Sequence, residues 1–287
     1  MSGTSLEPSP RTWEITSEIP GPLHTLADVW TYRRLTVFLG VRSLRKIYRR
    51  TILGWLWLFI IPLFPVALRT LVFGMLLGVM ADGIPYFLFL MAGTVVWDLF
   101  AIALLWGTRG LELHGGTQDV YVPRVIMPIG AMALAVLDLV IKLGVLAATI
   151  AYFWARDGRS YLAFGSSSAL IVVALLLAVL FAFSLALFTS VWSERTREVR
   201  FVLNQLTAVW YVATPVLYPM SSVPEEWRTW VLLNPMAPIT NAFNYGLFGI
   251  GEPHLRELGI AALVALALLT AGIRYFAAQD AATIDAR

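Results

Sequence analysis

The sequence predicts an all-α membrane protein with six transmembrane helices. Of its 287 residues, 59% are hydrophobic and only 14% are charged, and a soluble domain of this length could not bury so much apolar surface in one core. The apolar residues form runs of about 20, the length that a helix needs to cross a bilayer. The net charge of +3 does not indicate a nucleic-acid partner, because the basic residues cluster at the ends of the apolar runs.

The first 50 residues precede these apolar runs. Residues 1–25 are rich in proline, serine and threonine and contain no apolar signal-peptide core, so we expect a disordered cytosolic tail. Residues 26–50 predict an amphipathic helix that lies flat in the cytosolic membrane interface, either as a topology anchor or as an element that touches an anionic lipid-linked substrate. Its apolar face is Trp30, Val37, Val41, Leu44 and Tyr48, and its basic face is Arg42, Arg45, Lys46, Arg49 and Arg50.

Residues 51–287 are expected to form one six-helix transmembrane domain. The predicted spans are 52–79, 86–108, 129–154, 161–192, 201–218 and 258–278. If both termini are cytosolic, the outer loops hold only four of the 21 lysines and arginines: Arg156, Arg159, Arg228 and Arg256. This asymmetry follows the positive-inside rule and predicts that orientation.

The segment 214–254, between the fifth and sixth spans, is too rich in proline for one helix and too apolar for a free loop. Two short re-entrant helices, at 224–233 and 238–248, would satisfy both observations by dipping back into the outer leaflet. Broken backbone at membrane depth is tolerated where protein or a water-filled cavity covers it.

Four charged residues lie within the predicted spans. Asp138 and Lys142 are spaced i,i+4 and can pair on one helix face, either as a structural pair or as part of a proton relay. Asp98 has no partner nearby in the sequence, and Arg69 of the first span is a candidate partner. Arg69 can instead snorkel toward the outer surface.

The sequence carries no pattern typical of a catalytic, nucleotide-binding or metal-binding site. It lacks the G-x-x-x-x-G-K-[ST] phosphate loop, it has no cysteine, and His24, His114 and His254 are scattered. We therefore expect a permease with no cofactor and no metal of its own. If transport is driven by ATP, a separate chain has to bind ATP and Mg²⁺.

Three motifs follow one another along the chain. The first joins the basic helix to an apolar run through Leu53, Gly54, Trp57 and Pro62. The second is "YVPRVIMP" at 121–128, and the third is "LLNPMAPI" at 232–239. With these motifs and six spans, the chain resembles the membrane subunit of ABC-2 type exporters, in the branch that exports O-antigen, teichoic acid or capsular polysaccharide. The resemblance covers nearly the whole chain after the N-terminal tail.

The second motif predicts a short helix below the membrane, because Pro123 and Pro128 bracket a single helical turn. Its apolar side chains and one arginine could contact a soluble partner. The resemblance implies that this segment is the coupling helix that docks on the ATPase subunit, and the alternative is an ordinary proline-capped loop. The residues of the segment are Tyr121, Val122, Pro123, Arg124, Val125, Ile126 and Met127.

The resemblance also implies partners and a transport path. A second copy of the chain and two ATP-binding subunits would complete the transporter in the bacterial plasma membrane, with a lipid-linked polysaccharide as substrate. The residues implied to lie beside the lipid head group are Arg45, Arg49, Arg50, Trp55 and Trp57. The implied channel wall comprises Phe59, Phe64, Tyr211 and Tyr218 on the first and fifth spans.

Three other functions fit parts of the pattern. An ABC-2 exporter of a drug or small lipid would share the fold but enclose an apolar cavity. An ion-coupled secondary transporter would use Asp138 and Lys142 and need no ATPase chain. A membrane-embedded glycosyltransferase is disfavoured because the loops carry no acidic catalytic motif.

Overall fold

The computed structural model describes residues 31–48, 57–114, 124–163 and 165–285, so the expected tail at 1–25 lies outside it. Within these ranges the regular elements are helical, which confirms the all-α class. In chain order they are α2 (Arg33–Tyr48), α3 (Trp57–Arg69), the π-helical η2 (Thr70–Leu76), α4 (Tyr86–Thr108), α5 (Gly110–His114), α6 (Ile126–Asp157), η3 (Ser166–Ser168), α7 (Ala169–Arg195), α8 (Glu198–Ala213), η4 (Met220–Ser222), α9 (Glu225–Leu232), α10 (Met236–Phe248) and α11 (Leu255–Asp285).

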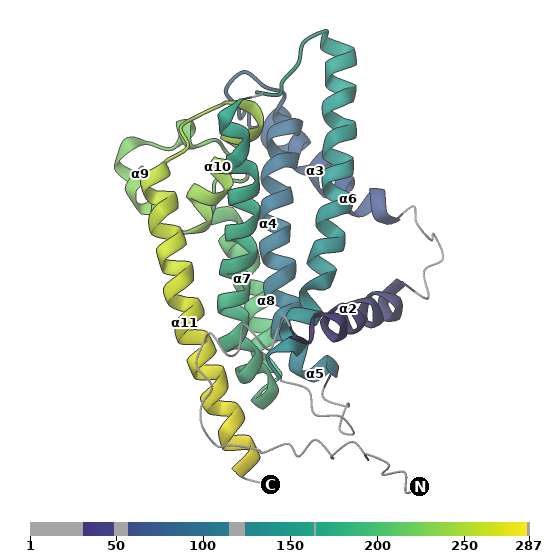
Figure 1. Ribbon diagram of the computed structural model, residues 1–287. Coiled ribbons are helices and arrows are strands. Elements are labelled where there is room, and N and C mark those ends of the chain that lie inside the picture. Colours follow the sequence, from purple (N-terminus) through teal and green to yellow (C-terminus); the bar gives the residue numbers. More distant parts are fainter. Residues whose placement is uncertain (1–30, 49–56, 115–123, 164, 286–287) are drawn as a thin grey trace, which may run out of the picture.

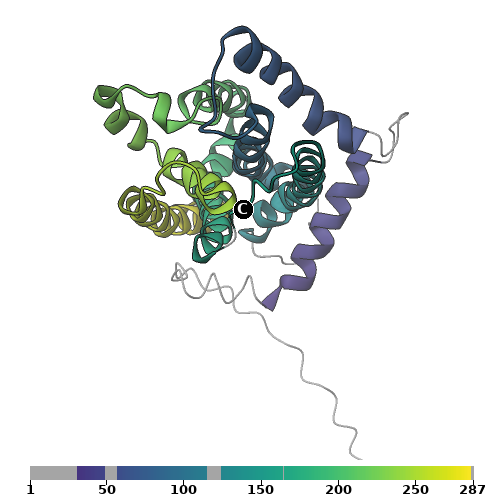
Figure 2. The ribbon, with the colours of Figure 1, turned by 90° about the horizontal axis from the view of Figure 1, so that it is seen from above.

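Helix α4 is the centre of the bundle. Helices α6, α7 and α10 pack directly against it, and α11 packs on the outer side of α7 and α10. Figure 1 shows α4 among these helices, with α2 at the foot of the bundle, and the view from above shows that α2 runs along the bundle's outer edge (Figure 2). We call the foot the α2 end and the opposite end, where α9 and α10 lie, the α9 end. The C-terminal part of α11 lies at the α2 end (Figure 1).

Four of the six expected spans are helices long and apolar enough to cross a membrane: Tyr86–Thr108, Ile126–Asp157, Ser166–Arg195 and Leu255–Gln279. The described helical part of the first expected span is α3 followed by η2, and it changes from α-helix to π-helix at Thr70. Residues 52–56 of that span lie outside the described residues. The fifth expected span is shorter than predicted. In the fifth, α8 ends at Ala213 because Thr214 is extended, the conformation favoured before a proline.

The interior of the bundle depends on close helix approach. At the α2 end of α4, Gly107 lies against Ala186 of α7, and a Cβ added to the glycine would be 2.8 Å from the Ala186 Cβ. One residue further on, the hydroxyls of Thr108 and Thr189 share a hydrogen bond of 2.7 Å. Small residues let helix backbones approach, and buried hydroxyls bond across them, as is typical of membrane helix pairs.

The two short helices expected between the fifth and sixth spans are present as α9 and α10, at Glu225–Leu232 and Met236–Phe248. Helix α10 is buried among α4, α7 and α11. Asn234 of the third motif explains its start, because its Oδ1 accepts hydrogen bonds from the backbone N–H of Met236 and from Nε1 of Trp210 in α8. Insertion of these helices into a membrane leaflet stays a prediction.

Helix α2 forms within the expected range 26–50 and packs against α6. Leu39 and Gly40 are buried in this contact, and a Cβ added to Gly40 would lie 2.6 Å from the Ala133 Cβ. Val37 and Phe38 are exposed to 65% and 61%. The helix therefore has an apolar surface left for lipid, as its predicted place at the membrane interface requires.

The contact at Gly107 makes a stability prediction. We expect Gly107→Ala to lower the free energy of unfolding by about 1–3 kcal/mol, because the new methyl group forces α4 away from Ala186. The measurement is thermal unfolding of the purified chain in detergent.

Gly144→Ala in α6 is the matched control, since no atom lies within 4 Å of its added Cβ. We expect this variant to be unchanged or slightly more stable, because alanine is the better helix former. Equal stability of the two variants would contradict the close packing of α4 on α7.

Candidate functional site

A buried ionic cluster joins α4 to α6 in the interior of the bundle. Lys142 has a side chain that is only 4% exposed, and its Nζ lies 2.5 Å from Oδ2 of Asp98 and 2.6 Å from Oδ2 of Asp138. The i,i+4 pair expected from the sequence is therefore present, and Asp98 joins it from the neighbouring helix. Lys142 donates to both carboxylates, so the cluster holds the two helices together where water is scarce.

Arg69, the candidate partner for Asp98, binds a different group. Its Nη1 donates to the hydroxyl of Tyr211 at 3.0 Å, and its guanidinium lies 4.5 Å from the centre of the Tyr211 ring. The ring of Tyr211 packs edge-on against Trp97 of α4. This contact attaches the end of α3 to α8 and to the core.

The four residues of the implied channel wall differ in their surroundings. Tyr211 is 7% exposed and held by Arg69, and Tyr218 is half-buried. Phe59 and Phe64 of α3 are exposed to 46% and 66%. Of these four, the two phenylalanines present the most open aromatic surface, and the channel assignment of all four stays a prediction.

The second sequence motif takes a form that differs from the expected separate helix. Ile126 begins the 32-residue α6, and Pro128 lies in its first turn, where proline is tolerated. Val125, Ile126 and Met127 are buried. They pack beneath α2, α7 and α11 rather than outward, while Tyr121, Val122 and Pro123 lie outside the described residues.

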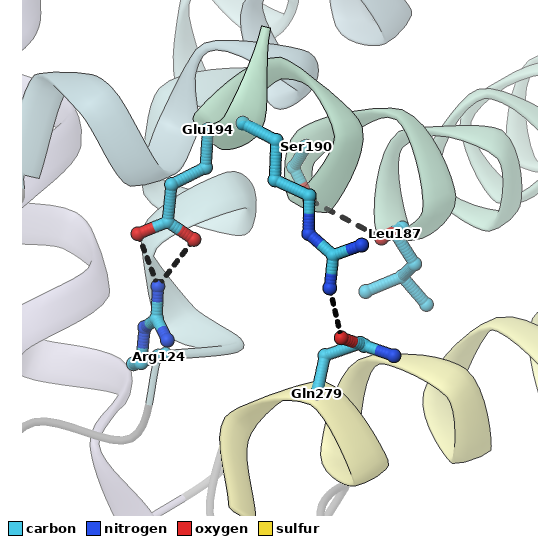
Figure 3. Close-up of polar contacts among 6 residues, drawn as sticks. Arg124, Leu187, Ser190, Glu194 and Gln279 are labelled. Carbon is cyan, nitrogen blue, oxygen red and sulfur yellow. Dashed lines mark hydrogen bonds and ion pairs between the residues drawn. The ribbon is translucent and has the colours of Figure 1, made fainter. Parts of the chain in front are cut away.

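Arg124 is bound within the chain. Its Nη2 lies 2.6 Å from both carboxylate oxygens of Glu194 at the end of α7, and nearby Arg195 contacts Gln279 of α11 (Figure 3). The sequence had suggested that Arg124 offers its charge to a partner. Instead, the arginine connects the start of α6 to α7, and a role of this segment in coupling stays a prediction.

The residues implied to lie beside the head group are only partly described. Arg45 lies in α2, and Trp57 is the first residue of α3. Arg49, Arg50 and Trp55 lie outside the described residues.

A basic pocket that the sequence did not reveal lies at the α2 end, between the end of α4, α5 and the start of α8. Its volume is about 580 Å³, and its lining includes Arg109, Arg197, Arg200, Glu112 and Trp106. Three guanidinium groups thus surround one carboxylate. Arg109 and Glu112 are far from Arg197 and Arg200 in the sequence, and only folding brings them together. The pocket could therefore not be predicted from the sequence.

Hydrogen bonding holds the basic pocket together. Arg200 donates to Glu112, and this bond lowers the pKa of the Glu112 carboxyl, with the charges of Arg109 and Arg197 acting in the same direction. Nε of Arg109 and Nε of Arg200 are buried and have no hydrogen-bond acceptor within the described part of the chain. Three arginines against one glutamate leave the pocket with an excess of positive charge, which favours an anion.

The fold and these polar sites agree with a membrane permease. The chain belongs to the ABC-2 type transporter family, whose model matches residues 34–248. The O-antigen export system permease protein RfbA of Myxococcus xanthus is 23% identical to it over 258 residues, which cover 88% of this chain and 95% of that protein.

The ionic cluster makes a prediction that separates a structural role from a proton relay. Lys142→Met should cost about 1.5–3 kcal/mol of stability, because two partly buried carboxylates lose the charged donor that they share. The triple variant Asp98→Leu, Asp138→Leu and Lys142→Met should recover most of this loss, since well-packed apolar residues can replace a buried ionic group.

Thermal unfolding in detergent measures the first effect, and transport by the triple variant decides the role. A structural cluster predicts a stable triple variant that still transports. A stable triple variant without transport would favour the relay.

Proposed function

We propose that this chain is the transmembrane subunit of an ATP-driven exporter that moves a lipid-linked polysaccharide from the cytosolic to the outer side of the bacterial plasma membrane. Two copies of the chain and two ATP-binding subunits form the transporter, and the ATP-binding subunits hold ATP and Mg²⁺. Membership of the ABC-2 type transporter family supports the transport class. The relative named as an O-antigen export permease supports the glycan class.

The distribution of charge supports an orientation with the α2 end in the cytosol. Arginines at the α2 end include Arg33, Arg34, Arg109, Arg124, Arg195, Arg197 and Arg200. The α9 end has fewer: Arg156, Arg159, Arg228 and Arg256. Cytosolic loops of membrane proteins carry the excess of lysine and arginine.

The basic pocket is the observation that carries the substrate assignment. A lipid-linked glycan has a phosphate or pyrophosphate group between its lipid and its sugar. The pocket offers Arg109, Arg197 and Arg200 at the cytosolic end of α4 and α8, and arginine binds phosphate through several parallel hydrogen bonds. A volume of about 580 Å³ accommodates a head group with its first sugar.

The contacts of Arg124 support coupling to ATP hydrolysis through this segment. The ion pair with Glu194 and the burial of Val125, Ile126 and Met127 tie residues 124–127 to both α6 and α7. A push on segment 121–127 by an ATP-binding subunit would therefore move two long helices together. Both of them pack on the central helix α4.

The basic pocket favours this function over export of a neutral drug, and the ionic cluster favours it over ion-coupled transport. A neutral drug needs no cluster of arginines, whereas an anionic lipid does. An ion-coupled transporter needs a carboxylate that can exchange its proton, and both Asp98 and Asp138 are bound to Lys142.

Binding of undecaprenyl pyrophosphate to the purified chain tests this proposal. We expect Arg197→Glu to weaken binding about tenfold, because it replaces an exposed cation of the pocket by an anion. Native mass spectrometry or a fluorescence titration in nanodiscs measures the affinity.

Arg256→Gln is the control variant, since Arg256 is exposed at the opposite end of the bundle, and it should bind as the unmodified chain does. Undecaprenol, which has the same tail without phosphate, should bind weakly to all three proteins. Equal binding of undecaprenol and undecaprenyl pyrophosphate would refute the head-group site.

A further inference from the structure

A second polar pocket, of about 230 Å³, lies at the α9 end, which the transport function does not yet use. Its walls come from six places in the chain: the turn before α4, the first half of α4, η4, α9, α10 and the loop before α11. Its lining includes Asp82, Phe89, Arg228, Asn241, Asn244 and His254. The pocket opens to the surface, because its lining includes exposed Ser221 and Glu252.

Two asparagines of α10 give this pocket unused hydrogen-bonding capacity. Asn244 is 3% exposed, and neither its Nδ2 nor its Oδ1 has a partner among the described residues. The same holds for Nδ2 of Asn241, one helical turn earlier. A buried amide without hydrogen bonds costs free energy. Two such amides in one wall therefore indicate a ligand that both donates and accepts hydrogen bonds.

Backbone strain is concentrated at the same pocket. Asp82 and His254 are the only non-glycine residues with positive φ in the described part of the chain, at 42° and 43°, and both line the pocket. Such residues cost free energy and tend to cluster at ligand-binding sites. Asp82 is held further by a hydrogen bond of 2.8 Å from the hydroxyl of Ser221.

The mixture of groups in the lining indicates which ligand fits. The negative charges of Asp82 and Glu252 would repel a phosphate group. The positive charge of Arg228 would repel a cation, and a hydrogen bond from its Nε to the carbonyl of Val223 holds this side chain in place. The described residues also contain no group of three or more His, Cys, Asp or Glu placed to hold a metal ion. A lining of amides, carboxylates and one arginine is suited to a neutral ligand rich in hydroxyl groups.

We propose that this pocket binds one neutral sugar unit of the glycan as it leaves the transporter. The assignment rests on the proposed export function, which makes the α9 end the outer side. The polar atoms of both amides are buried in the wall, so binding requires these side chains to turn toward the pocket. Sugar hydroxyls can then donate to Oδ1 of Asn244 and accept from Nδ2 of Asn241 and Asn244. Phe89, which is 3% exposed, contributes a small apolar part of the lining. The pocket is smaller than the roughly 300–1,000 Å³ of sites for drug-sized ligands, so it suits one ring at a time.

The test is saturation-transfer NMR on the full chain in nanodiscs, with a panel of methyl glycosides of neutral hexoses and deoxyhexoses. We expect at least one glycoside to bind in the millimolar range. Asn244→Leu should weaken that binding about tenfold or more, because a buried site without its amide leaves the sugar hydroxyls unpaired. The same variant should unfold at an equal or higher temperature, since leucine removes two unsatisfied polar atoms.

Two further variants keep the result interpretable. Asn241→Leu alters the half-buried amide, should also weaken binding, and decides the matter if Asn244→Leu does not fold. Gln205→Leu removes an exposed amide on α8, outside the pocket, and should bind as the unmodified chain does. Binding that survives both asparagine changes, or no binding of any glycoside, would overturn the proposal.

The assay needs neither an ATPase subunit nor a lipid carrier. If the unmodified chain does not bind undecaprenyl pyrophosphate, the head-group site is refuted, and the sugar-binding result is unaffected. Failure of the sugar pocket would likewise leave the head-group result unchanged.

Discussion

The ionic bridge from Lys142 to Asp98 and Asp138 is the constraint around which this bundle is arranged. Charges in an apolar interior persist only when they are paired, and here one ammonium group serves carboxylates on two helices. The bridge fixes α6 against α4 in the same bundle where close packing at Gly107 fixes α7 against α4. Apart from this cluster, the two polar pockets of the molecule lie at the ends of the bundle.

The two ends have complementary chemistry. The α2 end collects guanidinium groups around Glu112, which suits an anionic head group, and the α9 end collects amides and strained turn residues, which suit hydroxyl groups. A lipid-linked glycan has both kinds of group. Helix α8 begins at the basic pocket, and Arg69 and Asn234 tie its later part to α3 and to α10. A movement of α8 would therefore shift residues of the basic pocket directly, and residues of the α9-end pocket through α10.

Local patterns in the sequence predicted features that depend on residues close together in the chain. Contacts between distant residues depend on helix packing and could not be predicted in this way. The Asp138–Lys142 pair and the short helices α9 and α10 follow from i,i+4 spacing and from proline positions. The place of Asp98 in the cluster could not be predicted, because it depends on how α4 packs against α6. Glu112 and Arg200 are 88 positions apart, so no sequence window contains their contact. The predicted turn between Pro123 and Pro128 became the start of α6, because proline is tolerated in a first helical turn.

The central claim is that this chain is a conduit that moves only when a nucleotide-hydrolysing partner drives it. Reconstitution into vesicles tests the claim most directly, with a fluorescent lipid-linked oligosaccharide on one side and a sugar-modifying reagent on the other. The account predicts that the chain alone leaves the oligosaccharide protected, and that addition of its ATP-binding subunit and ATP makes it accessible. Transport by the chain alone, or transport driven by a proton gradient without ATP, would contradict the account.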